Sequence, residues 1–225
     1  LRGIAEKEDA AIEDEAAKIP MPEFIDNPPL TLDNSLIYRI EKIPAGGSLV
    51  VSTFETMTSA TAGLAFNMYA VPESLLVYVS ALPTLMTDVG VIIDGIPVPY
   101  DEMIERLRRE ILSLDVYYST NNRTERVELA VRGSGSDRDE SLKAIEWMST
   151  VIFSPDWRPE NLPRIRDAVD LALESLRNTM KRSEESWVHD PVNAYVHQDN
   201  RLYLSANSFL TKIHSLHRLK WMLKD

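Results

Sequence analysis

The chain has 225 residues, of which 44% are hydrophobic and 26% charged, and this is typical of a globular protein large enough to bury a core. Its net charge of −11 disfavours nucleic acids and anionic membrane surfaces as partners, because like charges repel. The sequence has no cysteine, which excludes disulfides and thiolate chemistry, and no apolar run approaches the ~20 residues of a bilayer span.

Residues 1–47 differ in composition from the rest of the chain. Residues 6–18 are acidic and helix-forming but have almost no apolar stripe, as in a solvent-exposed helix or a disordered arm. Four prolines between residues 20 and 29 then withhold backbone donors and favour extended backbone, which predicts a linker. We therefore place the domain itself at residues 48–225.

Two strand-like segments open this domain. Residues 48–55 and 62–69 are rich in β-forming residues, and a Thr/Ser stretch between them suits a turn. In the second segment Leu64, Phe66 and Met68 share one face at the two-residue period. We expect the two strands to form an antiparallel pair.

Two helices are predicted next. The first spans about residues 72–86, where apolar residues recur at helical spacing, and Pro83 is expected to kink or end it. A loop with the sequence VGVIIDGIPVP leads into the second helix. The apolar face of that helix is formed by Met103, Ile104, Leu107 and Ile111.

A second strand pair is predicted at residues 116–120 and 126–132, joined by the polar turn NNRTE. Gly133 and Gly135 are expected to break the second strand, and Asp137 is the predicted N-cap of the helix that follows. The inward residues of that helix are predicted to be Leu142, Ile145, Met148 and Ile152.

The remainder of the chain is predicted to be helical, with further helices around residues 185–198 and 205–223. The long helix before them is expected to turn inward Leu162, Ile165, Val169, Leu173, Leu176 and Met180. Strand pairs with helices on one face define an α+β fold with an antiparallel sheet and the order β-β-α-α-β-β-α-α.

The four histidines are the candidate metal ligands. His214 and His217 share a helix face, but a zincin-type site needs a glutamate between two histidines and a third ligand. His189 and His197 are too far apart in sequence to chelate together from adjacent turns. We expect structural or surface histidines; a small zinc enzyme that uses His214 and His217 is the alternative.

Two other patterns resemble functional motifs. RGSGSDRDE has the spacing of a dinucleotide-binding turn, but Arg138 replaces the third glycine and the neighbouring acids would repel a pyrophosphate. Glu184 and Glu185, near Trp187, His189 and Asp190, could divide acid and base roles, but consecutive helix residues point in different directions. A plain strand-to-helix turn and an acidic helix N-terminus are the favoured interpretations.

No catalytic, cofactor-binding or metal-ligating residue is predicted in this chain. It has no serine in a G-x-S-x-G context and no phosphate-binding P-loop. Its tryptophans are interpreted as core or interface anchors and not as a ligand cage: Trp147, Trp157, Trp187 and Trp221.

A family resemblance comes from the order and turn residues of five segments. They are VPESLLVYVSALPTLMTDVG, VPYDEMIERLRREI, RVELAVRGSG, SLKAIEWMSTVIFSPDW and ENLPRIRDAVDLALESLRNTM. From about Ser48 to its end, the chain resembles one repeat unit of the pitrilysin/insulinase superfamily of zinc metallopeptidases, especially the presequence-protease-like branch. The glycine-threonine step expected after the first helix reads Gly90-Val91 here.

The resemblance implies a place in a larger enzyme. Members of the superfamily have four such units, which close like a clamshell around an unfolded peptide. Their zinc lies in the first unit, at a His-x-x-Glu-His motif that this chain lacks, so zinc is expected only in the first domain of the parent protein. The proline-rich arm before Ser48 resembles the connection between the two halves, and this chain would then be the third unit.

The resemblance therefore predicts a non-catalytic chamber domain. Its expected partners are the sister domains of the same polypeptide and an extended peptide substrate. The alternative is a non-enzymatic scaffold or assembly module of the same superfamily. Because Leu1 is not an initiator methionine and no signal peptide follows it, we expect a fragment of a soluble protein from the cytoplasm or an organelle matrix.

Overall fold

The structure is a computed structural model that describes residues 37–44, 46–53, 59–182, 185 and 187–224. The predictions for residues 6–18 and 20–29 lie outside the described residues. Contacts along the chain divide it into two compact units, residues 1–56 and residues 57–225. The segment at residues 48–53, predicted as the first strand of the domain, belongs to the first unit.

The described part of the first unit is a β-hairpin. Strand β1 (Ile37–Lys42) pairs antiparallel with β2 (Ser48–Thr53), and Ile40 lies opposite Val50. The prediction that β2 pairs with the strand that follows it is wrong. The turn that reverses the chain precedes β2, where the N–H of Gly46 donates to the carbonyl of Ile43 at 2.9 Å.

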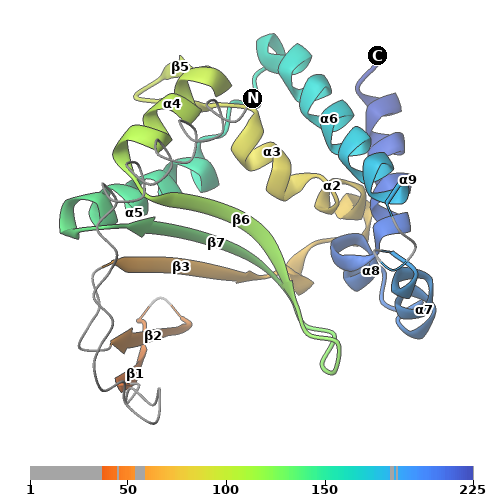
Figure 1. The fold of residues 1–225 in the computed structure, drawn as a ribbon, viewed down its shortest axis with the longest axis horizontal. Helices are drawn as coiled ribbons and strands as arrows, with labels where there is room; N and C mark the ends of the chain where they lie inside the picture. Colours follow the sequence, from red (N-terminus) through yellow and green to blue (C-terminus); the bar gives the residue numbers. More distant parts are fainter. Residues whose placement is uncertain (1–36, 45, 54–58, 183–184, 186, 225) are drawn as a thin grey trace, which may run out of the picture. The chain divides into compact units, whose positions relative to one another are not determined.

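The second unit contains a three-stranded antiparallel sheet with the strand order β3-β7-β6 (Figure 1). The strands are β3 (Ala60–Asn67), β6 (Ser113–Thr120) and β7 (Val127–Gly135). The β6–β7 hairpin confirms the second predicted strand pair. Gly133 and Gly135 do not break β7, because both are paired within the ladder to β3.

The other elements of this unit are mostly helical. In chain order they are η1 (Met68–Ala70), η2 (Glu73–Leu75), α2 (Leu76–Val79), α3 (Leu82–Asp88), β4 (Val91–Ile93), β5 (Ile96–Val98), α4 (Tyr100–Glu110), α5 (Arg138–Phe153), η3 (Pro159–Asn161), α6 (Leu162–Met180), α7 (His189–Val196), α8 (Arg201–Asn207) and α9 (Phe209–Met222). Among the described residues, no helix is both long enough and apolar enough to cross a bilayer.

Local signals explain two departures from the predicted helices. The helix predicted at residues 72–86 is interrupted between α2 and α3, and Pro83 lies in the first turn of α3, where its missing N–H costs no hydrogen bond. The predicted loop before α4 contains the hairpin β4–β5. Its turn is Asp94-Gly95, with φ of 52° and 79°, the backbone that a two-residue hairpin turn requires.

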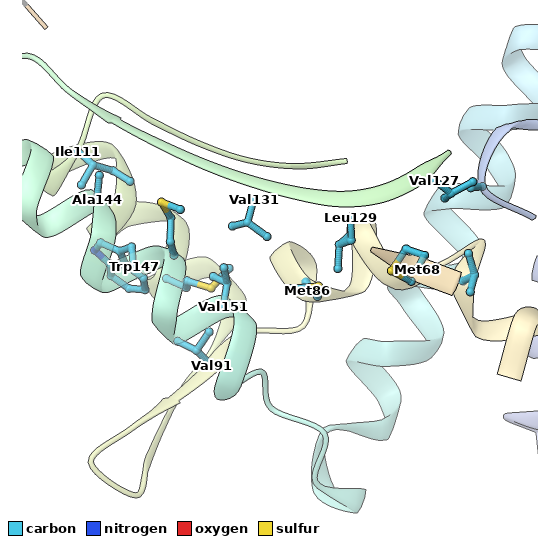
Figure 2. Close-up of a cluster of buried hydrophobic side chains, with 14 of the residues drawn as sticks. Met68, Met86, Val91, Ile111, Val127, Leu129, Val131, Ala144, Trp147 and Val151 are labelled. Atoms are coloured by element: carbon cyan, nitrogen blue, oxygen red, sulfur yellow. The ribbon is translucent and has the colours of Figure 1, made fainter. Parts of the chain in front are cut away.

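The main core lies between the sheet and the helices on one of its faces. Val127, Leu129 and Val131 of β7 share the buried face of the sheet at the two-residue period, and Figure 2 shows Val127 beside Met68 at the end of the strand away from α5. On α5 the buried face contains Ala144, Trp147, Met148 and Val151. This arrangement confirms the α+β class with helices packed on one face of an antiparallel sheet.

The predicted inward face of α5 is partly wrong, since Leu142 and Ile145 are 52% and 49% exposed. The cause is the close approach of α5 to the glycines of β7. A Cβ atom on Gly135 would lie 2.2 Å from the backbone nitrogen of Ser141, and one on Gly133 would lie 3.0 Å from the carbonyl oxygen of Ala144. The face of α5 that carries Ser141 and Ala144 therefore lies on the sheet, and Leu142 and Ile145 turn away from it.

A second core joins α3, α6 and α9. Val169 and Leu173 of α6 are buried in it, and Ile165 and Leu176 pack against it, as predicted. Met180 is half-exposed, contrary to prediction, because this cluster ends one helical turn earlier, at Leu176.

Candidate functional site: the open sheet face and the hairpin tip

The sheet of the second unit has a second face, opposite the helices, that carries small and polar residues. We call it the open face. Its residues are Thr61, Gly63, Ala65 and Asn67 of β3, Glu128, Ala130, Arg132 and Ser134 of β7, and Ser113, Asp115, Tyr117 and Ser119 of β6. The Thr61 and Ser134 hydroxyls lie 3.0 Å apart, and the Arg132 guanidinium lies 5.4 Å from the centre of the Tyr117 ring.

Strand β3 forms one edge of this sheet. It pairs with β7 on one side, and no strand in the described part of the second unit pairs with its other side. Leu64 and Phe66 of this strand are exposed. An edge strand of this kind presents unpaired backbone N–H and C=O groups that can hydrogen-bond an added strand.

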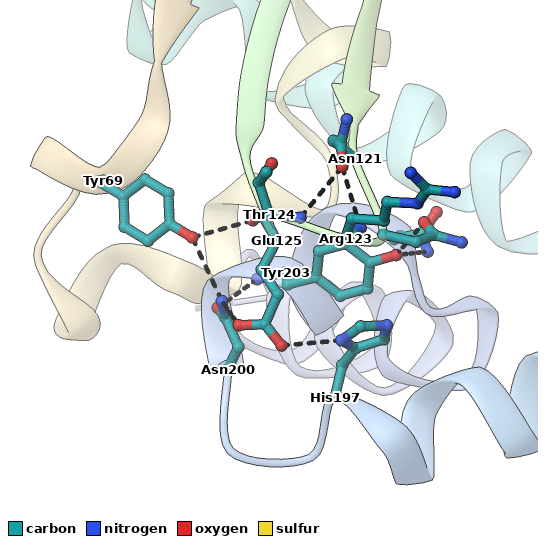
Figure 3. Close-up of polar contacts among 10 residues, drawn as sticks. Tyr69, Asn121, Arg123, Thr124, Glu125, His197, Asn200 and Tyr203 are labelled. Carbon is teal, nitrogen blue, oxygen red and sulfur yellow. Dashed lines mark hydrogen bonds and ion pairs between the residues drawn. The ribbon is translucent and has the colours of Figure 1, made fainter.

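The turn between β6 and β7 is fixed by a group of polar contacts that we call the tip cluster (Figure 3). Glu125 adopts a positive φ of 54°. Its carboxylate accepts a hydrogen bond from Asn200 Nδ2 at 2.9 Å and lies 2.8 Å from Nδ1 of the buried His197. Its backbone carbonyl accepts a hydrogen bond from the Tyr69 hydroxyl at 2.9 Å.

Tyr203 extends the tip cluster into the core. Its hydroxyl donates to Asn122 Oδ1 at 2.6 Å and accepts from Asn207 Nδ2 at 3.0 Å. The His197 and Tyr203 ring centres lie 4.3 Å apart. The contacts of the tip cluster join the β6–β7 turn to α8 and to the segment that precedes it.

The tip cluster lowers the pKa of Glu125. The hydrogen bond from Asn200 makes the largest contribution, followed by the contact with His197, because both favour the carboxylate over the neutral acid. A carboxylate beside an imidazole is also part of a nucleophile-activating triad, but in the described part of the chain no hydroxyl is bonded to His197. We therefore interpret the tip cluster as structural.

The other histidines do not come together. His189 and His214 are exposed, and the ring of His217 lies 3.5 Å from the Arg177 guanidinium, a cation that disfavours a bound metal ion. Across the described ranges, no group of three or more histidine and carboxylate side chains is placed to hold a metal ion. His214 and His217 lie on one helix, α9, as their spacing predicts.

The resemblance to a dinucleotide-binding turn has a structural explanation. The two glycines belong to an antiparallel strand and allow α5 to approach β7, as described above. The Asp137 carboxylate accepts a hydrogen bond from the N–H of Glu140 at 2.9 Å, which confirms the predicted N-cap. Glu140 in turn accepts hydrogen bonds from the N–H and hydroxyl of Ser136, at 2.9 and 2.7 Å.

The acidic pair at residues 184–185 is only partly visible, because Glu184 lies outside the described residues. The nearby Asp190 has a defined role. Its carboxylate accepts hydrogen bonds from the N–H of Phe209 at 2.7 Å and from the Ser208 hydroxyl at 3.2 Å. Asp190 therefore caps the N-terminus of α9 from another helix.

The tryptophans have separate environments. Trp147 is buried in the main core and donates from Nε1 to Glu110 at 3.0 Å. Trp157 and Trp221 are exposed. The Nε1 of Trp187 is buried and has no hydrogen-bond partner among the described residues.

Sequence reasoning missed the tip cluster and the cap from Asp190. Glu125 lies 72 residues from His197 in the chain, and nothing in the turn NNRTE indicates which distant side chain it meets. The only local signal was the polar character of that turn.

Comparisons with known proteins assign no family. No protein-family model matches the chain, and no curated protein matches it. A solved structure described as a conserved protein from Enterococcus faecalis V583 is similar, with 13% identity and a TM-score of 0.49, over 78% of this chain and 43% of that one. The chain thus spans less than half the length of that protein, and a likeness at this level indicates no activity.

Proposed function

We propose that this chain is a non-catalytic wall of the substrate chamber of a larger zinc metallopeptidase that degrades unfolded peptides. The observation that carries the proposal is the open face of the sheet, with the unpaired edge of β3 beside it. The family resemblance of the sequence is the reason to expect a zinc site, and it places that site in another domain of the parent protein. The contribution of this domain to catalysis is to hold the peptide extended and to exclude folded proteins.

The chemistry of the open face suits a peptide of varied sequence. Its hydroxyl, amide and small side chains can accept different residues, while the β3 edge supplies main-chain hydrogen bonds that do not depend on the side chains of the peptide. The charged residues on this face are of both signs, including Asp115 and Arg132, so no single charge type is selected.

A stripe of exposed apolar residues on α7 supports the existence of a packing partner for the second unit. Val192, Tyr195 and Val196 are 66%, 73% and 66% exposed, and their spacing places them on one side of the helix. Three exposed apolar residues on one helix face are typical of an interface. We assign the partner as a sister domain of the same polypeptide.

The hairpin of the first unit supports the same conclusion. Tyr38, Ile40 and Val50 share one face of the hairpin, and each is more than half exposed. A two-stranded hairpin is marginally stable by itself in water, so this face is expected to be covered in the parent protein. An assembly subunit without catalytic activity would present the same apolar surfaces, and it is the second candidate function.

The test of peptide binding uses the β3 edge. Successive residues of a strand direct their N–H groups to opposite sides, so only one of Ala62→Pro and Gly63→Pro removes a ladder hydrogen bond to β7. The proline variant that keeps the wild-type unfolding midpoint has lost the outward N–H and not a bond to β7, and we call it the edge variant. Unstructured fluorescein-labelled peptides should bind the wild-type chain, measured by fluorescence anisotropy, and should bind the edge variant more weakly.

Equal binding by the edge variant would exclude the β3 edge as the contact. Chelator-sensitive cleavage of the same peptides by the 225-residue chain alone would refute a non-catalytic role. The sequence that precedes Leu1 in the full reading frame separates the two candidate functions, because a His-x-x-Glu-His motif there supports the peptidase and its absence supports the assembly module.

A further inference from the structure

A half-open cavity of about 570 Å³ lies in the second unit, mainly on the helix side of β6. Residues from β6, α3, α6, α8 and α9 form its wall. The cavity shares Tyr117 with the open face and Asn207 with the contacts of Tyr203, and the rest of its wall lies outside the open face and the tip cluster. The residues that matter for its chemistry are Asp88, Tyr118, Leu171, Leu176, Lys212 and Leu216. Its size is in the range of sites that bind small organic molecules.

Lys212 supplies the cavity with a positive charge that has no partner. It lies in the second turn of α9, and in the described part of the chain its ammonium forms neither a hydrogen bond nor an ion pair. Burial lowers the pKa of Lys212, and the charge of Asp190 opposes this effect only in part. The Asp190 carboxylate is already occupied by the N-terminus of α9, at 2.7 Å from the N–H of Phe209.

The second charged residue of the wall does not neutralise the first. Asp88, at the end of α3, accepts a hydrogen bond from the Thr87 hydroxyl at 3.0 Å, and it forms no ion pair with Lys212. Two further polar groups of the wall bond to the protein itself. The Tyr118 hydroxyl donates to the carbonyl of Val79 at 2.9 Å, and the Ser80 hydroxyl donates to the carbonyl of Ser205 at 3.0 Å.

The remainder of the wall is mixed, with apolar side chains beside the polar Thr84, Tyr117, Ser175 and Asn207. Its apolar side chains come from β6, α3, α6, α8 and α9: Val116, Pro83, Leu171, Ala172, Leu176, Ala206 and Leu216. A ligand that fills this space needs a compact apolar group, and a ligand that satisfies Lys212 needs an anionic group. In a partly desolvated site, an ammonium gains more from a direct anionic partner than it does at an exposed surface.

We propose that this cavity binds a small organic carboxylate with a compact apolar group, with the carboxylate on Lys212. Two sources have this chemistry: a free carboxylic acid and the C-terminal residue of a short peptide. The inference is independent of the proposed chamber function, since the β3 edge takes no part and the open face contributes only Tyr117.

The test measures binding by isothermal titration calorimetry, with NMR of the ¹⁵N-labelled chain to locate the site. The probes are 4-methylpentanoate, its uncharged amide, and acetyl-alanyl-leucine, which has a free carboxylate after a peptide bond. We expect 4-methylpentanoate to bind, and its amide to bind at least about tenfold more weakly, because it loses a charge-assisted hydrogen bond. Amide shifts should gather on α9, α6 and β6.

Lys212→Met removes the charge and keeps most of the side-chain volume, and it should weaken carboxylate binding by the same factor. The matched control is Lys220→Met, on the same helix, where the ammonium pairs with Asp170 at 2.5 Å outside this cavity. The control should bind both carboxylates like the wild type. Circular dichroism checks that each variant is folded, and the acid–amide comparison on the wild-type chain holds even if Lys212→Met unfolds.

The two sources are distinguished by relative affinity. Tighter binding of acetyl-alanyl-leucine indicates a peptide C-terminus, and tighter binding of 4-methylpentanoate indicates a free acid; either result supports the site. Equal affinity for the acid and its amide, unchanged binding by a folded Lys212→Met variant, or NMR shifts confined to other elements would overturn the proposal.

Discussion

The contact between β7 and α5 can be tested by adding one methyl group at Gly135. A Cβ atom there would lie 2.2 Å from the backbone nitrogen of Ser141 and 2.5 Å from the carbonyl carbon of Glu140. Ordinary contacts of such an atom begin at 3.4 Å, so the first turn of α5 must move by 3.4 − 2.2, or 1.2 Å. No side chain can rotate to relieve the clash, because both neighbouring atoms belong to the backbone.

The loss of unfolding free energy depends on which contacts of α5 this movement breaks. The first turn of α5 is held by the Asp137 cap, and the next turns bury Ala144 and Trp147 against the sheet. Overpacking of a core costs about 1–3 kcal/mol, and loss of an N-cap costs about 1 kcal/mol. We expect Gly135→Ala to lower the free energy of unfolding by about 3 kcal/mol, a large part of the ~5–15 kcal/mol that holds a domain together.

Urea unfolding followed by tryptophan fluorescence measures this change, since Trp147 lies in the core beside the affected turn. Gly63→Ala is the matched control. A Cβ atom on Gly63, in the neighbouring strand β3, would lie 3.4 Å from Arg132 Cγ, an ordinary contact. We expect the control to change the free energy of unfolding by less than ~1 kcal/mol.

The reasoning is refuted if Gly135→Ala unfolds at the same urea concentration as the Gly63→Ala control. That result would mean that α5 does not approach β7 as closely as the backbone positions imply. The correction of the α5 face, which exposes Leu142 and Ile145, would then lose its explanation.

Three further predictions concern the tip cluster, the cap of α9 and the core. The pKa of Glu125 is held below its ordinary 4.5, so the stabilising contribution of Glu125 is complete above pH 4.5 and is lost as the pH falls through the folded-state pKa. Urea titrations at a series of pH values should therefore show the difference in unfolding free energy between wild type and Glu125→Gln shrinking over that acidic window. Asp190→Ala should cost about 1–2 kcal/mol of unfolding free energy, seen by calorimetry, and an unchanged melting temperature would contradict the cap. Trp147→Phe removes the part-buried hydrogen bond to Glu110 and leaves a smaller ring in the core, so we expect a loss of about 2 kcal/mol in the free energy of urea unfolding. A loss within ~0.5 kcal/mol would contradict the 3.0 Å hydrogen bond.

The sequence by itself predicted features whose signals are local. Apolar residues at helical spacing located α4 and α6, and the alternation in Val127, Leu129 and Val131 located the buried face of β7. The antiparallel β6–β7 hairpin and the Asp137 cap depend on neighbours only a few residues apart. These features together were enough for the α+β class.

The same local signals led to errors where a partner had to be chosen. The strand at residues 48–53 has a pattern that suits either neighbouring strand, and only the folded chain shows it paired with β1. Leu142 and Ile145 were assigned to the core of α5 because they are apolar, whereas the glycines of β7 decide which side of the helix reaches the sheet.

Tertiary structure alone brought together the groups on which the candidate sites depend. Glu125 and His197 are 72 residues apart, and the cavity around Lys212 has walls from four distant parts of the chain. The periodicity of a segment records which of its faces is apolar, but not which other segment covers that face. That choice is made by the packing of the whole unit, where shape, burial and hydrogen bonding are satisfied at the same time.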